Sequence, residues 1–297
     1  MGYNEQFNLY LTRFEAKLNS FLNSLDKTTP NIIRESITYS LLNGGKRIRP
    51  VLCYATADAL GVSLDKVDNF ALAIEFIHSY SLVHDDLPAM DNDDYRRGKL
   101  STHKKFGEAY GILAGDALLN LAFETCLSKY EFSKNDLRAT SVVAEYAGYR
   151  GMISGQVWDL LAETTDFSQK SVREQYDALK EIFINKTSKL LTAPLLVASE
   201  LADKKCFETL KEFGTNLGIM FQITDDILDV EGSLETIGKT PNKDKEANKL
   251  TAVKIFGVDG AKTKANDLYN KCKELLALVP NNEFLLKFTD KIYFRKK

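Results

Sequence analysis

The sequence predicts an almost entirely α-helical protein that folds as one domain over residues 1–297. Apolar residues recur at spacings of three and four along most of the chain, as at Phe70, Ala73, Ile74 and Ile77, and this spacing is typical of amphipathic helices. No stretch shows the regular alternation of strands, and six prolines leave long helices possible. Because no repeat or low-complexity block indicates a linker, one domain is the simplest partition.

Composition narrows the class of protein. A chain of 297 residues with 44% apolar residues can build a sizeable core. It has no membrane-spanning apolar run and no secretion signal, so we expect a cytoplasmic protein without stable membrane association. A net charge of −2 argues against bulk nucleic-acid binding. Four scattered cysteines without a Cys-x-x-Cys pair argue against zinc and disulfide frameworks.

The first interruption of the helical pattern is the segment 43–50. Its glycines predict the end of one helix, and Pro50 predicts the first position of the next. Lys46, Arg47 and Arg49 place three cations within four residues. Such a turn can hold a phosphate, assisted by the free N–H groups of the following helix. Taken alone, the segment is better interpreted as a solvated basic turn, and the neighbouring motifs change that interpretation.

A helix predicted over 69–83 leads into the first acidic cluster. His78, Ser81 and Asp85 lie at i, i+3 and i+7, so they share one face. On its own, His78 would be interpreted as a hydrogen-bonded core histidine. For His84 an orienting or structural role is favoured over catalysis.

Asp85 and Asp86 are followed by a segment that alternates acids and arginines. Pro88 removes a helical hydrogen bond and should loosen the backbone. The loosened turn would allow Asp91 to return toward Asp85, although an ideal helix would carry it to another face. Further charged residues follow: Asp93, Asp94, Arg96 and Arg97. An ordinary surface loop is the alternative interpretation.

A second acidic cluster begins 140 positions after the first. Gln222, Asp225, Asp226 and Asp229 lie at i, i+3, i+4 and i+7, which predicts one helix face with an amide and three carboxylates. Like charges this close repel, and burying them unpaired is costly. A hard divalent cation removes both problems, and oxygen ligands without a nearby cysteine suit Mg²⁺.

Several lysines are weaker signals. Lys186 and Thr187 lie on a predicted helix, where a lysine is usually only solvated. Lys239 and Lys249 belong to the polar segment Glu231–Leu250, which we interpret as a flap that closes over an anion or, alternatively, as an ordinary flexible loop. Four residues between the two clusters are assigned to packing: Gly148, Gly151, Gly155 and Trp158.

Together, the acids indicate metal sites, the bases indicate phosphate sites, and the apolar surface near the first cluster indicates a hydrocarbon tail. The motifs resemble those of the trans-isoprenyl diphosphate synthases, and most of all the bacterial farnesyl diphosphate synthases, whose first motif is expanded by two residues as at Pro88-Ala89. The matching segments, in order over nearly the full length, are Gly44–Pro50, His84–Asp91, Arg96–Gly98, Lys186-Thr187 and Gln222–Asp229.

The resemblance implies a homodimer of all-α subunits, each a single large helical bundle around a central cavity. It implies three Mg²⁺ ions on the allylic diphosphate, with metal ligands Asp85, Asp86, Asp91, Asp225 and Asp229. It places the allylic substrate on Arg96, Lys186, Thr187, Gln222 and Lys239. It places isopentenyl diphosphate on Lys46, Arg49, His78 and Arg97, with Lys249 as a further diphosphate contact. The role of the terminal Arg295, Lys296 and Lys297 stays open.

The implied reaction condenses isopentenyl diphosphate with dimethylallyl and geranyl diphosphate. An allylic carbocation forms with the help of Mg²⁺, and the product is (E,E)-farnesyl diphosphate. The implied catalytic residues are Asp85, Asp86, Asp91, Arg96, Lys186, Asp225 and Lys239. Tyr80 and Ser81 would form the cavity floor that limits chain length, and geranylgeranyl diphosphate is the alternative product.

Three other classes of protein fit the sequence less well. A terpene cyclase mixes Asn, Ser and Glu in its second metal motif and needs no site for a second diphosphate. A His-Asp metal phosphohydrolase requires more histidines than His78, His84 and His103. A non-catalytic synthase subunit should have lost acids, yet six carboxylates are present in the two clusters.

Overall fold

The computed structural model describes residues 2–128, 131–235 and 249–295. Its helices are α1 (Tyr3–Asn23), α2 (Asn31–Leu42), α3 (Ile48–Leu60), α4 (Asp68–Asp85), α5 (Thr102–Phe106), α6 (Glu108–Cys126), α7 (Lys134–Ala147), α8 (Met152–Thr164), α9 (Val172–Ile182), α10 (Lys189–Leu201), α11 (Phe207–Glu235), α12 (Ala252–Leu276) and α13 (Glu283–Tyr293). A 3₁₀ turn spans Leu64–Lys66, and a π-helical turn spans Phe183–Ser188.

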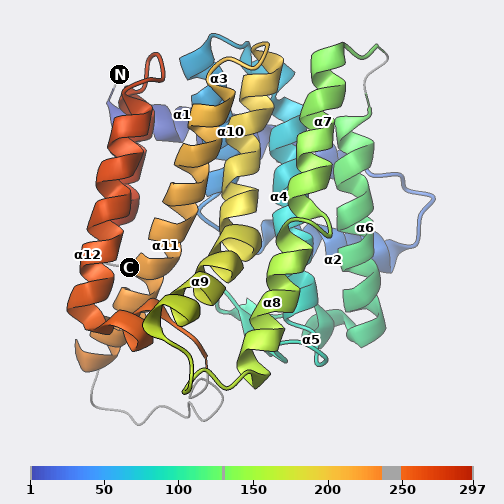
Figure 1. Cartoon of the computed structure of the whole chain (residues 1–297). Coiled ribbons are helices and arrows are strands. Elements are labelled where there is room, and N and C mark those ends of the chain that lie inside the picture. The colour runs from blue at the N-terminus through green and yellow to red at the C-terminus, as the bar shows by residue number, and fades with distance from the viewer. Residues whose placement is uncertain (1, 129–130, 236–248, 296–297) are drawn as a thin grey trace.

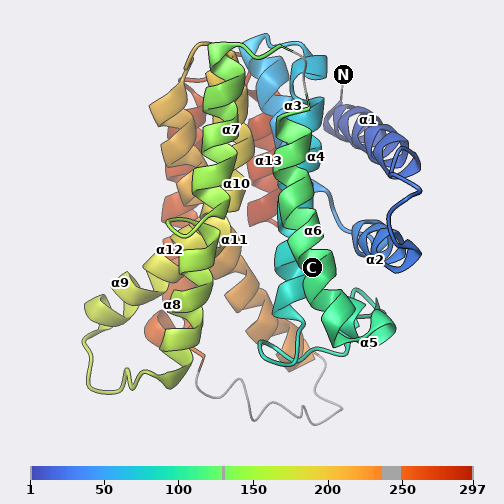
Figure 2. The ribbon, with the colours of Figure 1, turned by 90° about the vertical axis from the view of Figure 1, so that its right-hand side faces the viewer.

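The long helices run roughly side by side as a bundle, and α1 and α2 cross them at one side (Figures 1 and 2). Helix α10 is the central element, because it packs on α3, α7 and α11 and is buried along most of its length. Helix α4 packs on α6, and α11 packs on α12. The first acidic cluster begins at the end of α4, and the second lies on α11. The packing of these helices in the bundle therefore sets the positions of the two clusters.

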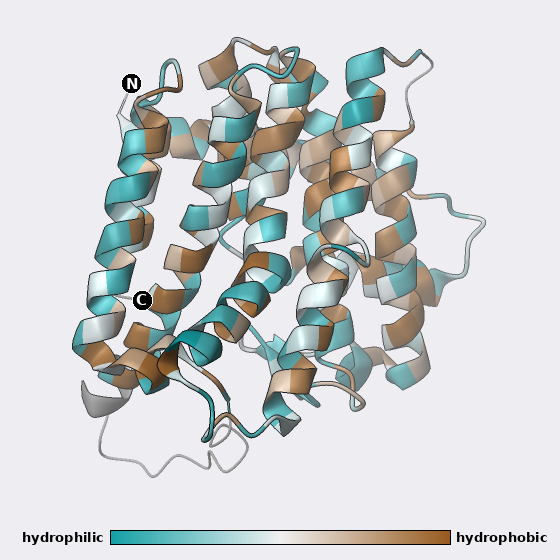
Figure 3. Ribbon diagram, in the orientation of Figure 1, coloured by the Kyte–Doolittle hydropathy of each residue, from teal (hydrophilic) through white to brown (hydrophobic). Residues whose placement is uncertain are grey.

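The core explains why these segments are helices. Apolar and polar residues alternate along the helices at helical spacing (Figure 3), and large side chains from distant elements are fully buried together. Phe14 of α1, Phe70 and Phe76 of α4 and Phe213 of α11 have no exposed surface. Burying such side chains contributes roughly 1.5–3 kcal/mol each. The predicted all-helical class is confirmed.

The described residues form one small sheet. Strands β1 (Tyr95–Arg96) and β2 (Lys99–Leu100) pair antiparallel with Tyr95 opposite Leu100. Arg97 and Gly98 close the hairpin with φ of 53° and 77°, as a two-residue turn of the favoured hand requires. The hairpin lies in the segment that the sequence analysis treated as a charged loop.

Three helix boundaries differ from the prediction. Helix α3 begins at Ile48 rather than Pro50, because Arg47 turns the chain in a left-handed conformation and a proline is tolerated within a first turn. Helix α4 continues to Asp85, two residues past the predicted end at Val83. Helix α11 continues to Glu235, past the predicted break at Glu231. None of the described helices combines the length and apolarity that crossing a bilayer requires.

Candidate active site

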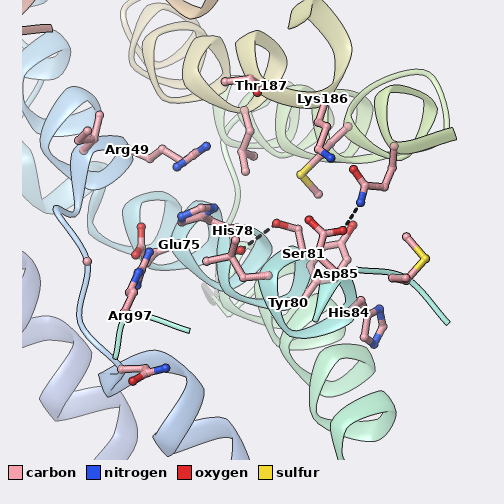
Figure 4. A pocket seen from close by; sticks show the side chains of 18 of the residues that line it. Arg49, Glu75, His78, Tyr80, Ser81, His84, Asp85, Arg97, Lys186 and Thr187 are labelled. Carbon is pink, nitrogen blue, oxygen red and sulfur yellow. Dashed lines mark hydrogen bonds between the residues drawn. The ribbon is translucent and has the colours of Figure 1, made fainter. Parts of the chain in front are cut away.

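A cavity of about 1370 Å³ opens between α4, α6, α8, α11 and the start of α3. Asp85 and Asp225, one from each acidic cluster, both line it. Figure 4 shows Arg49, His78 and Arg97 at one side of this space and Asp85 and Lys186 at the other. Further lining side chains are apolar: Ile112, Leu119, Met152, Ile153 and Leu190. The cavity therefore joins a charged region to a hydrocarbon-like region.

The first acidic cluster forms where α4 ends. The backbone N–H of Asp91 donates to the carbonyl oxygen of Asp85 at 2.8 Å, so the loop does return Asp91 to Asp85 as predicted. The side-chain amide of Gln156 donates to Asp85 Oδ1. Burial raises the pKa of Asp85 to about 6, with Asp91 adding to the shift and Lys186 opposing it. Ionised Asp85 is thus held at a cost in free energy.

Asp86 and Arg96 lie off the cavity. Asp86 is only 2% exposed, and it accepts a hydrogen bond from Arg96 Nε at 2.8 Å. The guanidinium of Arg96 is also 3.6 Å from Asp93. Burial raises the pKa of Asp86 and Arg96 counteracts the rise. Contact of Arg96 with an allylic substrate stays a prediction, and it would require Arg96 to leave Asp86.

The second acidic cluster meets the end of the chain. Arg295 Nη2 lies 2.6 Å from Asp225 Oδ1, and the same guanidinium donates to the carbonyl oxygen of Phe221 at 2.7 Å. It also stacks 4.0 Å from the ring centre of Phe221. Gln222 donates to the other oxygen of Asp225 at 3.4 Å. A cation from the C-terminal end therefore already neutralises Asp225.

The other two carboxylates of this cluster do not line the cavity with Asp225. Asp226 accepts the backbone N–H of Ala252 at 2.7 Å, so it faces the start of α12. Burial raises the pKa of Asp226 to about 6, with repulsion from Asp229 contributing. All three carboxylates lie on one helix as predicted, but a free N–H at the start of α12 binds Asp226, which is not one of the predicted metal ligands.

The three cations of the basic turn, Lys46, Arg47 and Arg49, all line the cavity but differ in their partners. Arg47 is buried and pairs with Glu75 at 2.8 Å and Glu15 at 3.0 Å, so its charge is already compensated within the protein. Arg49 Nε is buried without a hydrogen-bond partner among the described residues, and burial lowers the pKa of Arg49 to about 10. A partly buried guanidinium whose Nε has no hydrogen-bond partner among the described residues can bind an anion that enters the cavity.

His78 and Arg97 complete this basic side. Burial and the neighbouring arginines hold the pKa of His78 well below its usual value, so the imidazole is neutral. Arg97 donates to the carbonyl oxygen of Gly44. Gly45 has a φ of 134°, and a Cβ there would lie 2.6 Å from Arg97 Nη1. The two glycines thus let the turn close around the guanidinium.

Lys186 and Thr187 also line the cavity, from the π-helical turn before α10. Lys186 Nζ lies 2.5 Å from Asp159 Oδ2 of α8. Burial alone would lower the pKa of Lys186, but Asp159 and the nearby Asp85 raise it above its usual value. Gln156 and Asp159 were not predicted as site residues, although their spacing of three puts both on one face of a helix.

The predicted floor residues, Tyr80 and Ser81, both line the cavity. The Tyr80 hydroxyl is buried without a described partner, and burial raises its pKa to about 12. The ring of Tyr80 packs edge-on against His84 at 5.8 Å. His84 in turn fits against Gly115, where a Cβ would lie 2.0 Å from Nε2. The structural role expected for His84 therefore includes support of Tyr80.

The remaining predicted site residues lie elsewhere. Lys249 lines a separate groove with Glu163 and Lys254. Lys239 and most of the predicted flap lie outside the described residues. Among residues 2–128, 131–235 and 249–295, no three His, Cys, Asp or Glu side chains converge as a ready metal site.

The chain is similar to known proteins over nearly its full length. Residues 30–279 match the polyprenyl synthetase family model. The chain is 42% identical over 268 residues to a farnesyl diphosphate synthase of Micrococcus luteus, covering 89% of this chain and 90% of that protein. It is 38% identical to a farnesyl diphosphate synthase of Haemophilus influenzae, covering 98% and 99%. A geranyltransferase of Legionella pneumophila superposes with a TM-score of 0.84 at 31% identity, covering 98% and 96%.

The chain belongs to the polyprenyl synthetase family. The predicted family, the isoprenoid-synthase type of fold and the transferase activity are thereby confirmed. As a polyprenyl synthetase, the chain is a prenyltransferase, and its relatives agree with the farnesyl interpretation. The phosphohydrolase and terpene-cyclase alternatives lose their support.

Proposed function

We propose that this polyprenyl synthetase condenses isopentenyl diphosphate with dimethylallyl and geranyl diphosphate to give (E,E)-farnesyl diphosphate. The observation that carries the proposal is the single cavity lined by Asp85, Asp225 and a separate group of cations. Two diphosphates need two anion sites. Lys186 and Thr187 beside the acids suit the allylic diphosphate, and Lys46 and Arg49, with Arg97, suit isopentenyl diphosphate.

The donor set fits Mg²⁺ as the cofactor. The acidic residues offer carboxylate oxygens, and Mg²⁺ is commonly held by one or two carboxylates together with substrate phosphates. The described carboxylates do not converge on one point, which suits Mg²⁺ ions that enter together with the diphosphate. We propose three such ions. Asp85 at the end of α4 and Asp225 on α11 would hold these ions from the two acidic clusters. Asp91, Asp86 and Asp229 would assist them. Bound Mg²⁺ would stabilise the charge that develops on the departing diphosphate.

The chain's own residues would perform the remaining work. Lys186 would bind the allylic diphosphate oxygens, and Lys46 and Arg49 would fix isopentenyl diphosphate so that its double bond faces the allylic carbon. Stabilising the leaving group makes ionisation of the allylic C–O bond feasible. Apolar residues such as Leu119 and Met152 would exclude water from the cation. Neutral His78 is not assigned as a base, and the proton is proposed to leave with pyrophosphate.

The product length is proposed from the floor. Tyr80 closes the cavity wall five positions before Asp85, and His84 and Gly115 hold its ring in place. Growth beyond fifteen carbons would require this ring to move, which supports farnesyl over geranylgeranyl diphosphate.

A homodimer is part of the proposal. Large apolar side chains on α6 and α8 are about half exposed in the single chain: Ile112, Leu113, Val157, Trp158, Leu160 and Leu161. Exposed apolar surface of this kind commonly marks an interface, so the half-exposed Trp158 does not pack inside its own subunit as predicted. Helices α6 and α8 both lie on the face turned to the viewer in Figure 2. A cytoplasmic location stays the expectation drawn from the sequence.

The direct test is a product assay. Purified protein is incubated with Mg²⁺, isopentenyl diphosphate and dimethylallyl or geranyl diphosphate, and the products are dephosphorylated and sized by chromatography. We expect fifteen-carbon farnesol. Release of phosphate without prenyl growth would refute synthase activity, and a twenty-carbon main product would refute the proposed length.

A further inference from the structure

We propose that Asp159 is a positioning residue that holds Lys186 away from the first acidic cluster and so keeps Asp85 and Asp91 available to a divalent cation. The inference rests on the proposed function, because it assigns a task within the allylic diphosphate site. Asp159 does not line the cavity, whereas Lys186 and Asp85 do. It therefore acts through Lys186 and not on the substrate.

The backbone contact between α8 and the π-helical turn makes this arrangement possible. A Cβ on Gly155 would lie 2.0 Å from the backbone nitrogen of Lys186, so α8 touches the turn directly. Lys186 lies inside the π-helical stretch Phe183–Ser188. Such turns insert an extra residue into a helix and often occur at functional sites. One turn along α8 from Gly155, Asp159 reaches the Lys186 ammonium at 2.5 Å.

Charge and burial show what the contact prevents. The side chains of Lys186 and Asp159 are 27% and 14% exposed, so solvent screens them weakly. Asp85 and Asp91 also attract Lys186 electrostatically. Without the Asp159 charge, the flexible lysine would be drawn to these two carboxylates. There it would compete with a divalent cation for the same oxygens.

Gln156 lies on the same face of α8 as Asp159. It lies three residues before Asp159, and its amide donates to Asp85 Oδ1. Helix α8 thus holds Asp85 through Gln156, and it holds Lys186 through Asp159. The pair fixes the separation of Asp85 and Lys186 before any ligand enters.

The test compares Asp159→Asn with the wild type. Isothermal titration calorimetry would measure binding of a non-reactive thiolo analogue of dimethylallyl diphosphate over a range of Mg²⁺ concentrations. We expect the half-saturating Mg²⁺ concentration to rise about tenfold, on the order of one partly screened charge pair. The KM for isopentenyl diphosphate in the condensation assay should stay within twofold, because Lys46 and Arg49 lie at the other side of the cavity. Asp159→Glu keeps the charge and should restore the wild-type Mg²⁺ requirement.

Two further variants separate positioning from simple destabilisation. Asp177 on α9 pairs with Arg173, and its side chain is 65% exposed. Asp177→Asn should therefore leave Mg²⁺ binding unchanged. In a Lys186→Met background, Asp159→Asn should cause no further rise in the Mg²⁺ requirement. An equal rise in both backgrounds, or no rise for Asp159→Asn alone, would overturn the inference while the wild type still binds. Wild-type protein without Mg²⁺-dependent binding would overturn the proposed function itself.

Discussion

Replacing Asp85 by asparagine should stabilise the ligand-free protein while removing its activity. The Asp85 carboxylate is buried at the end of α4 beside Asp91, and these surroundings raise its pKa to about 6. Above that pH the protein must hold an ionised carboxylate in an unfavourable place. Asparagine has nearly the same shape and still offers an oxygen to the amide of Gln156, so it relieves the charge without losing the acceptor.

The magnitude follows from the pKa shift of Asp85. A rise in the pKa from the ordinary aspartate value of 3.8 to about 6 corresponds to roughly 3 kcal/mol, because a tenfold change in a binding constant is worth about 1.36 kcal/mol. Partial solvent screening of a cavity-lining group reduces this to about 1–2 kcal/mol. Between pH 4 and 6 the unfolded chain releases the Asp85 proton first, so wild-type stability falls as pH rises through this window. The advantage of the variant should be absent near pH 4 and complete above pH ~6.5.

The assay is differential scanning calorimetry with EDTA at several pH values. At pH 7.5 we expect Asp85→Asn to melt roughly 2–6 °C above the wild type. Asp267→Asn, at an exposed position on α12, serves as the matched control and should show no pH-dependent difference. With Mg²⁺ and an inert allylic analogue the order should reverse, because only the wild type binds the ion well. A variant that melts lower at pH 7.5, or one whose advantage is the same at every pH, would refute the reasoning.

Four further predictions concern the floor, the helix contact, the cofactor and the subunit interface. Tyr80→Ala should shift the main product beyond fifteen carbons, and unchanged farnesol on chromatography would contradict the floor assignment. Gly155→Ala should lower the free energy of unfolding in urea by about 2–4 kcal/mol, since its Cβ meets the backbone of Lys186; an unchanged midpoint would show that α8 moves freely. EDTA should abolish condensation and added Mg²⁺ should restore it, so turnover that persists in chelator would exclude the proposed cofactor. Trp158→Glu should turn the dimer into monomers by light scattering, whereas a dimer of wild-type mass would place the interface elsewhere.

Much of the cavity could be predicted because its residues follow helical spacing. His78, Ser81 and Asp85 share one face of α4 and all line the cavity, as the i, i+3, i+7 pattern requires. The return of Asp91 to Asp85 also followed from a loosened backbone, although the loosening takes the form of a helix end rather than a distorted helix.

The errors have a common physical origin in partners that lie far away along the chain. Arg47 was predicted only as one of three cations in the basic turn, and in the structure it is paired with Glu15 and Glu75. Asp226 was predicted to lie on the acidic face of α11, but in the structure it accepts a backbone N–H from the start of α12. No local pattern reports a partner 26 or more residues away in either direction, so only the tertiary structure could show which of these charges are already paired.

Because Arg295 binds Asp225, the position of Arg295 depends on what occupies the second acidic cluster. Helix α13 ends at Tyr293, two residues before this arginine, and packs on α1 and α3. A cation that binds Asp225 must displace the Arg295 guanidinium, so ligand binding should loosen the backbone that follows α13.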